Sequence, residues 1–112
     1  MMYKQGDMLL IPIPFTDLTS TKKRPVLVLS NDNYNYKTDD IIVAAITSNI
    51  ASKDYSILIT NNDLVEGNLK VDSCIRVDKI YTLSQNIVVK KFGKVTSHVM
   101  NEVKNKINEL TK

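Results

Sequence analysis

Short apolar runs separated by polar segments make up most of the chain. Runs of this kind are rich in Val, Ile and Leu and are bounded by Asn, Asp, Gly or Pro, which is typical of buried strands. We expect strands over residues 8–15, 26–30, 41–48, 55–60, 72–78 and 86–95. In the first run, Pro12 and Pro14 lie two apart and place both missing N–H groups on one edge, which indicates an edge position or a strand end.

The polar segments between these runs predict turns. Residues 16–21 form a polar loop, and residues 31–40 are dense in Asn and Asp, whose side chains favour local turns. Residues 63–67 are compatible with a short turn or a helical hook. We expect none of these segments to contribute a strand.

The C-terminal segment changes to helical spacing. Ser97 has the character of an N-cap, and the apolar residues behind it recur every three or four positions. This stripe consists of Val99, Met100, Val103, Ile107 and Leu110. Five or six short strands followed by one amphipathic helix predict a mainly β (α+β) domain covering residues 1–112, built as a strongly bent sheet or partly open barrel.

Composition narrows the function classes. The 112 residues include 15 Lys or Arg and 12 Asp or Glu, and the net charge of +3 is compatible with a polyanionic partner without requiring one. Cys74 and His98 are the only residues of their kinds, which excludes a disulfide framework and a Cys/His metal site within one chain. We therefore expect no metal and no cofactor. No apolar run is long enough to cross a bilayer and no signal peptide precedes residue 8, so we expect a cytoplasmic protein without a membrane partner.

A cluster of cations precedes the second strand. Lys22, Lys23 and Arg24 lead directly into Pro25, which pushes Arg24 toward extended geometry at the mouth of the strand. An arginine held there is well placed to bind a phosphate, because its planar guanidinium can contact two oxygens. The alternative, a solvated loop entering a core strand, remains open at this point.

Two later strands also end or alternate in polar residues. Arg76 and Asp78 share one face of the fifth strand, where they form either a plain salt bridge or a pair suited to acid–base chemistry. Thr47 ends the third strand and can donate a hydrogen bond to a phosphate oxygen. Ser48 and Asn49 continue this row of donors, and Lys53 adds charge.

The ordered set of these blocks resembles the MazF/PemK toxins. The blocks are Gly6-Asp7, Lys23-Arg24-Pro25-Val26, Ser30-Asn31-Asp32, Ile42–Ser48, Asp72–Asp78 and Met100-Asn101-Glu102-Val103. The resemblance implies an SH3-like β-barrel of the CcdB/MazF type that forms a homodimer. It also implies a metal-independent, sequence-selective endoribonuclease that cleaves single-stranded mRNA. A cognate antitoxin protein would inhibit it and would bind DNA together with it.

The resemblance also assigns roles by position. Arg24 and Thr47 match catalytic residues of the family, and Arg76 and Asp78 match an Arg-x-Asp element used for acid–base work. The RNA-binding candidates are Lys22, Lys23, Asn31, Ser48, Asn49 and Lys53. The loop before Arg24 is shorter than in many relatives and contains neither a histidine nor a Glu-Gln pair, a departure that bears on the preferred cleavage site.

Two other functions fit the same fold. A CcdB-like toxin poisons DNA gyrase through a Trp-containing tail, whereas this chain has no Trp. A nucleic-acid-binding barrel without catalysis would bind RNA with a steep salt dependence and yield no product.

Overall fold

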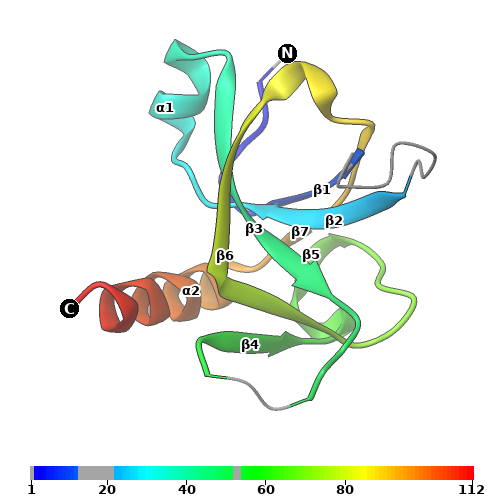
Figure 1. Ribbon diagram of the computed structural model, residues 1–112. Coiled ribbons are helices and arrows are strands. Elements are labelled where there is room, and N and C mark those ends of the chain that lie inside the picture. The colour runs from blue at the N-terminus through cyan, green and yellow to red at the C-terminus, as the bar shows by residue number, and fades with distance from the viewer. Residues whose placement is uncertain (1, 13–21, 52–53) are drawn as a thin grey trace.

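The computed structural model describes residues 2–12, 22–51 and 54–112. Its strands form one 7-stranded antiparallel sheet in the order β4-β6-β3-β2-β1-β7-β5. In chain order the elements are β1 (Asp7–Pro12), β2 (Lys23–Val28), α1 (Asp32–Lys37), β3 (Asp40–Thr47), β4 (Ser56–Ile59), the 3₁₀ helix η1 (Asn61–Asp63), β5 (Leu64–Gly67), β6 (Ser73–Ser84), the 3₁₀ helix η2 (Gln85–Ile87), β7 (Lys90–Val95) and α2 (Ser97–Leu110) (Figure 1).

The sheet curls because its two edge strands are consecutive in the chain. β4 and β5 stand at opposite ends of the hydrogen-bonded order, yet only residues 60–63 connect them. A flat sheet would separate its edges by about 29 Å at a strand spacing of about 4.8 Å. A connection of this length reaches about 18 Å at most. The expected bent sheet with a C-terminal helix is therefore confirmed.

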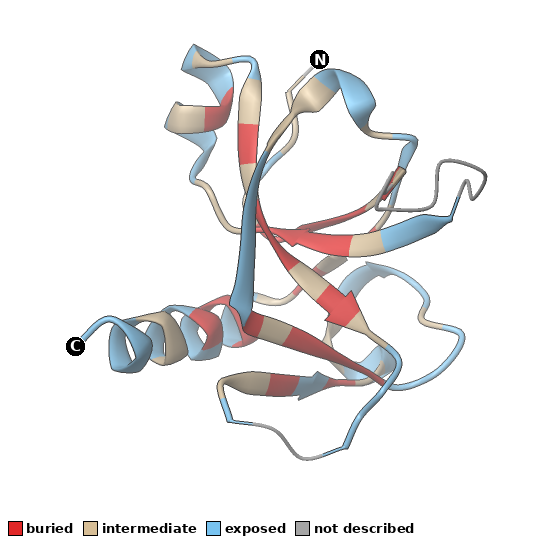
Figure 2. Ribbon diagram, in the orientation of Figure 1, coloured by how far each residue is buried: buried red, intermediate tan, exposed pale blue. Residues whose placement is uncertain are grey.

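The inner face of the curl and α2 enclose the main hydrophobic core. Buried residues of the strands, among them Met8, Leu27 and Ile75, pack with Val99 and Val103 of the helix. The buried segments of the central strands and the first turns of α2 accordingly line the same side (Figure 2). The predicted helix stripe is thus used within the chain itself, except for Leu110, which is exposed.

A second, smaller cluster covers the opposite face of the central strands. It contains Leu9, Ile11, Val26, Val28, Ile41 and Val43, with Tyr3, Leu83 and Val88 packed against it. The long strand β6 (12 residues) contributes side chains to both clusters. It reaches both because its register against β3 shifts between the pair Ala44–Ile80 and the pair Ala45–Arg76. The irregularity bends β6, as bulges generally do (Figure 1).

Several local expectations were wrong. The predicted strand 86–95 is shorter, because residues 85–87 form η2 and β7 begins at Lys90. Residues 32–37 form the helix α1, because the Asn31 side chain accepts a hydrogen bond from the Tyr34 N–H at 2.8 Å and so caps a first turn. Residues 64–67 form the strand β5, which is stabilised by pairing with β7. The cap of α2 is Thr96 rather than Ser97, since the Thr96 side chain accepts from the Val99 N–H.

Pro25 lies inside β2 and not at its first residue. It pairs with Leu10 of β1, while β3 pairs only with Val26–Val28. One side of Pro25 therefore has no neighbouring strand among the described residues, which is where a residue without an N–H is tolerated. The part of the first predicted strand that contains Pro14, and the loop 16–21, lie outside the described residues.

Candidate active site and basic cleft

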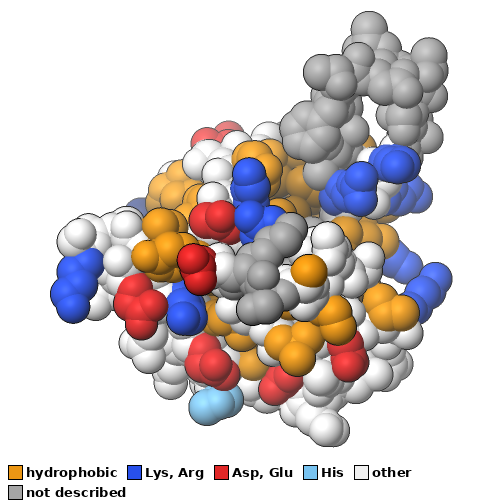
Figure 3. Space-filling model, turned by 60° about the horizontal axis from the view of Figure 1, so that its bottom comes forward, with side chains coloured by type: hydrophobic (Ala, Val, Ile, Leu, Met, Phe, Trp, Pro, Cys, Tyr) orange, Lys and Arg blue, Asp and Glu red, His pale blue; other side chains and the backbone are white. Residues whose placement is uncertain are grey.

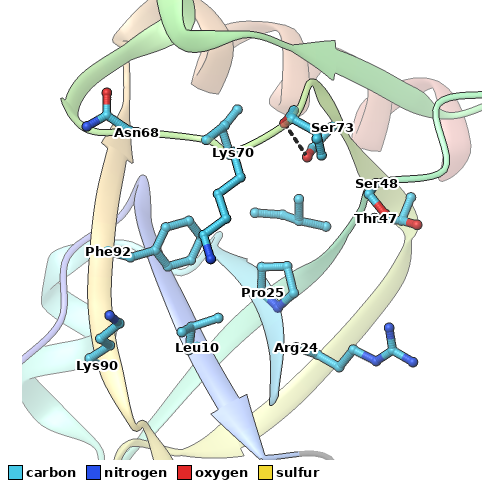
Figure 4. Close-up of a pocket in the computed structure, with 13 residues that line it drawn as sticks. Leu10, Arg24, Pro25, Thr47, Ser48, Asn68, Lys70, Ser73, Lys90 and Phe92 are labelled. Atoms are coloured by element: carbon cyan, nitrogen blue, oxygen red, sulfur yellow. Dashed lines mark hydrogen bonds between the residues drawn. The ribbon is translucent and has the colours of Figure 1, made fainter. Parts of the chain in front are cut away.

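A cleft of about 470 Å³ opens at the end of the sheet where β2 begins. Its walls come from β1, β2, β3, β7 and the segment between β5 and β6 (Figure 4). The lining residues are Leu10, Arg24, Pro25, Ile46, Thr47, Ser48, Asn68, Leu69, Lys70, Val71, Ser73, Lys90 and Phe92. None of the described residues lining it is Asp or Glu. We call it the basic cleft.

Strand register brings Arg24 and Thr47 to the same place. Val26 of β2 lies opposite Ala45 of β3 in an antiparallel pair. Two residues further on, at the mouth of the sheet, the same alternation puts Arg24 and Thr47 on the face that carries Val26, Ala45 and Arg76. Both line the basic cleft, together with Ser48.

The Thr47 hydroxyl is oriented by the turn that follows β3. Its Oγ1 accepts a hydrogen bond from the Asn49 N–H at 3.1 Å. A hydroxyl has one proton to donate and two lone pairs, so this bond leaves the proton of Thr47 available to an anionic ligand.

Arg76 and Asp78 form a two-point ion pair outside the basic cleft. Arg76 Nε donates to Asp78 Oδ1 at 3.1 Å, and Arg76 Nη2 donates to Asp78 Oδ2 at 3.0 Å. This hydrogen bonding lowers the pKa of the Asp78 carboxyl and raises the pKa of the Arg76 guanidinium. Asp78 therefore accepts a proton less readily than a free carboxylate, which weakens its predicted role as a general base.

The depressed pKa of Asp78 has a consequence for stability. A carboxyl whose pKa is lowered by folding stabilises the native state above its unfolded value of about 3.9, and this contribution disappears as the pH falls through the lower folded value. We expect urea-unfolding curves to show a steeper loss of stability for the natural chain than for Asp78→Asn below about pH 3.9. Identical pH dependence in the two proteins would contradict the ion pair.

Arg24 stands between two hollows. Together with Pro25 and Ile46, it lines the basic cleft and also a second groove of about 490 Å³, which lies on the face of the sheet that carries Val26 and Ala45. The second groove is lined by Ile11, Pro12, Arg24, Pro25, Val26, Ala45, Ile46, Tyr81, Leu83 and Ile87. We call it the apolar groove, since Arg24 is its only charged residue among those described.

The remaining predicted RNA-binding residues are dispersed. Lys22 and Lys23 are exposed next to Arg24 without lining the basic cleft, and Asn49 is exposed with its Oδ1 accepting from the Ala51 N–H. Asn31 caps α1 beyond the opposite end of β2, so the structure does not bring it to Arg24. Lys53 lies outside the described residues.

Among the cleft residues that were not predicted as site residues, four carry cationic, amide or aromatic side chains. Asn68 and Lys70 come from the segment after β5, and Lys90 and Phe92 come from β7. The run of lysines at 90–94 was a sequence signal for a wider basic surface. Figure 3 shows one group of Lys and Arg side chains at the upper right, while others lie among the Asp and Glu side chains on the same face.

Lys91 has a structural role that its neighbour Lys90 lacks. Its Nζ lies 3.3 Å from Asp7 Oδ1 and 3.3 Å from Glu66 Oε2, which ties β1, β7 and β5 together. These acidic partners raise the pKa of Lys91 against the opposing effect of burial. Asp7 is buried, and its Oδ2 also accepts from the Lys4 N–H at 2.8 Å. The lysine cluster is therefore divided between the cleft wall and an internal ion pair.

Solved structures share this fold. An endoribonuclease in complex with its cognate antitoxin from a mycobacterial species superimposes with a TM-score of 0.77 at 18% identity, covering 94% of this chain and 90% of that one. A MazE–MazF complex from Deinococcus radiodurans gives a TM-score of 0.77 at 19% identity, covering 99% and 96%. At these identities the likeness establishes the fold alone, a small curled β-sheet with one C-terminal helix.

The sequence establishes the family. Residues 4–111 match the family of PemK-like, MazF-like toxins of type II toxin–antitoxin systems, and the chain belongs to it. The chain is also 30% identical over 110 residues to Endoribonuclease MazF of Staphylococcus saprophyticus, covering 96% of this chain and 89% of that protein. The resemblance drawn from the sequence blocks is confirmed. Within the described residues, no helix is long and apolar enough to span a membrane.

Proposed function

We propose that this toxin is an endoribonuclease that cleaves single-stranded mRNA without a metal ion and thereby inhibits translation and growth. The observation that carries the proposal is the meeting of Arg24 and Thr47 in a cleft whose described charged residues are all cations. The homologous staphylococcal protein bears the name endoribonuclease. This relationship favours cleavage over a gyrase poison or a non-catalytic barrel.

RNA can be cut without a metal because it carries its own nucleophile. The 2′-hydroxyl loses its proton and forms a bond to the adjacent phosphorus. The bond from phosphorus to the 5′ oxygen then breaks, and that oxygen takes up a proton. The products are a 2′,3′-cyclic phosphate and a 5′-hydroxyl end, and the protein must stabilise the negative charge that builds up between them.

Arg24 is suited to this stabilisation. Its guanidinium stays protonated at any physiological pH and can hold two phosphate oxygens at once. Thr47 adds a hydroxyl donor whose acceptor side is already occupied by the Asn49 N–H. In this proposal Arg76 supplies a further cation on the same face as Ala45, its partner in β3, and Asp78 holds the guanidinium in place.

The direct test is incubation of the purified protein with a long single-stranded RNA in EDTA. Discrete fragments with cyclic phosphate ends are expected, and sequencing of those ends gives the preferred site. Intact RNA under these conditions would refute the proposed activity. Damaged DNA with intact RNA after induction in cells would instead support a gyrase poison.

We further propose that a cognate antitoxin is the inhibitor. The mycobacterial and Deinococcus structures named above contain antitoxin partners. An acidic antitoxin segment would compete with RNA for Arg24. Adding the antitoxin should therefore first raise the apparent KM for RNA and then stop cleavage. The complex of the two proteins would be the DNA-binding form, and both would act in the cytoplasm.

A homodimer is proposed from the apolar groove. Tyr81 and Ile87 are 39% and 38% exposed and line the groove next to Leu83. A second copy of the chain would remove this apolar surface from water. Light scattering is expected to give twice the mass of 12.7 kDa. A monomeric mass at all concentrations would contradict the dimer.

A further inference from the structure

We propose that the part of the basic cleft formed by Asn68, Lys70, Lys90 and Phe92 binds a nucleotide next to the scissile phosphate and selects its base. This subsite rests on the proposed function, since it places the neighbouring nucleotide of the RNA that Arg24 would cleave. It gives these residues a role in the choice of sequence and leaves the bond-breaking chemistry to the Arg24 end of the cleft.

The lining of the cleft matches the two halves of a nucleotide. Its floor is apolar and includes Leu10, Leu69 and the ring of Phe92, against which a flat base can stack. Its described charged residues are Arg24, Lys70 and Lys90, which suit the phosphates of the chain. Loss of a single stacking side chain from such sites commonly weakens binding by about 5- to 100-fold per base.

Lys70 and Phe92 approach each other from opposite walls. In Figure 4, Lys70 extends from the segment after β5 across the opening toward the ring of Phe92. Asn68 lies at the end of that segment next to β5, at the rim of the cleft, with its amide directed outward. Arg24 and Thr47 lie toward the other end of the same cleft. A nucleotide held by Lys70 and Phe92 would therefore be a neighbour of the one at Arg24.

The wall that carries Asn68 and Lys70 is held in place before any ligand binds. The Asn61 side chain accepts from the Leu69 N–H at 2.7 Å and donates to the Leu69 carbonyl at 3.3 Å, so it satisfies both backbone groups of the residue between them. Leu69 also packs against the core. A preorganised wall of this kind is what discrimination between bases requires, because less ordering is needed on binding.

Chemistry favours RNA over an acidic peptide as the occupant. The side-chain amide of Asn68 offers both a donor and an acceptor, the combination needed to read the edge of a base in a single strand. Carboxylates are acceptors only and gain nothing from an amide oxygen. A flat aromatic surface beside cations likewise fits a base linked to phosphates better than it fits a run of Asp or Glu.

The first test is the cleavage pattern. Asn68→Ala is expected to reduce the preference for one base at a single position beside the cut by about 5- to 100-fold. Asn105→Ala, which removes an exposed amide from α2, is the matched control and should leave the pattern unchanged. Identical patterns and KM values in both variants would overturn the subsite while leaving the proposed nuclease intact.

The second test does not depend on cleavage. Fluorescence anisotropy with a short randomised single-stranded RNA in EDTA is expected to show weaker binding for Lys70→Ala than for Lys104→Ala, which removes the same charge from an exposed position on α2. The salt dependence should fall by about one phosphate contact. If the natural chain binds RNA in this way but never cuts it, the proposed nuclease fails and the subsite stands. Equal RNA binding by the two variants would overturn the subsite. It would also be overturned if Lys70→Ala weakened the binding of a poly-glutamate peptide but not that of RNA.

Discussion

Replacing Arg24 with alanine is expected to lower the rate of RNA cleavage by about 100- to 1,000-fold. The guanidinium is the group that we place against the developing charge on phosphorus, and loss of one such donor commonly has an effect of this size. Arg24 is exposed at the mouth of β2, so the fold should survive. Initial rates on a mapped RNA substrate in EDTA measure the effect, and circular dichroism checks the fold.

Arg24→Lys separates the charge from the shape of the side chain. Lysine keeps the cation but loses the planar fork that binds two oxygens, so it should recover only a small part of the lost rate. Lys104→Ala on α2 serves as the charge-matched control and should retain full activity. Unchanged cleavage by Arg24→Ala in a correctly folded protein would remove Arg24 from the mechanism.

Replacing Gly67 with alanine is expected to destabilise the chain by about 4 kcal/mol or more. Gly67 has a φ of +81°, and a Cβ placed there would lie 2.1 Å from the Phe92 carbonyl oxygen and 2.7 Å from the Gly93 Cα. The two glycines face each other in the register of β5 and β7. Backbone must move to accommodate even one methyl group, and the wall of the basic cleft would move with it.

Gly6→Ala provides the control for this close approach. Gly6 also has a positive φ, of +92°, but its added Cβ would meet only ordinary contacts at 3.6 Å or more. Strain in the left-handed region alone costs about 1–2 kcal/mol. Urea unfolding of both variants should therefore show the larger loss at Gly67, and equal losses would mean that the contact with Phe92 is not rigid.

The two patterns that were predicted well from the sequence are local ones. Continuous apolar runs gave the positions of the main strands, and the spacing of Val99, Val103 and Ile107 gave the helix. The pairing of Arg76 with Asp78 also follows from alternation along a single strand. Each of these depends on residues close together in the chain, where steric preference and side-chain direction are set by neighbours.

The errors arose where a distant residue decides the local structure. β5 exists because β7 supplies hydrogen bonds and because Gly67 and Gly93 allow close approach. The run 32–37 is helical with Asn31 as its cap, and the buried Asn35 amide donates to the carbonyls of Tyr3 and Ser30. The turn prediction for this run weighed only the local preference of Asn and Asp.

The candidate site divides in the same way. The sequence by itself determined the barrel class, the family and the cations before β2, because these follow from ordered blocks and local charge. Only the tertiary structure decided that Asn68, Lys70 and Phe92 share a cleft with Arg24, that Asn31 does not, and that Arg76 lowers the pKa of Asp78. The physical reason is that a cleft and a pKa depend on groups brought together by strand pairing and core packing, and their distances in space do not follow from their spacing along the chain.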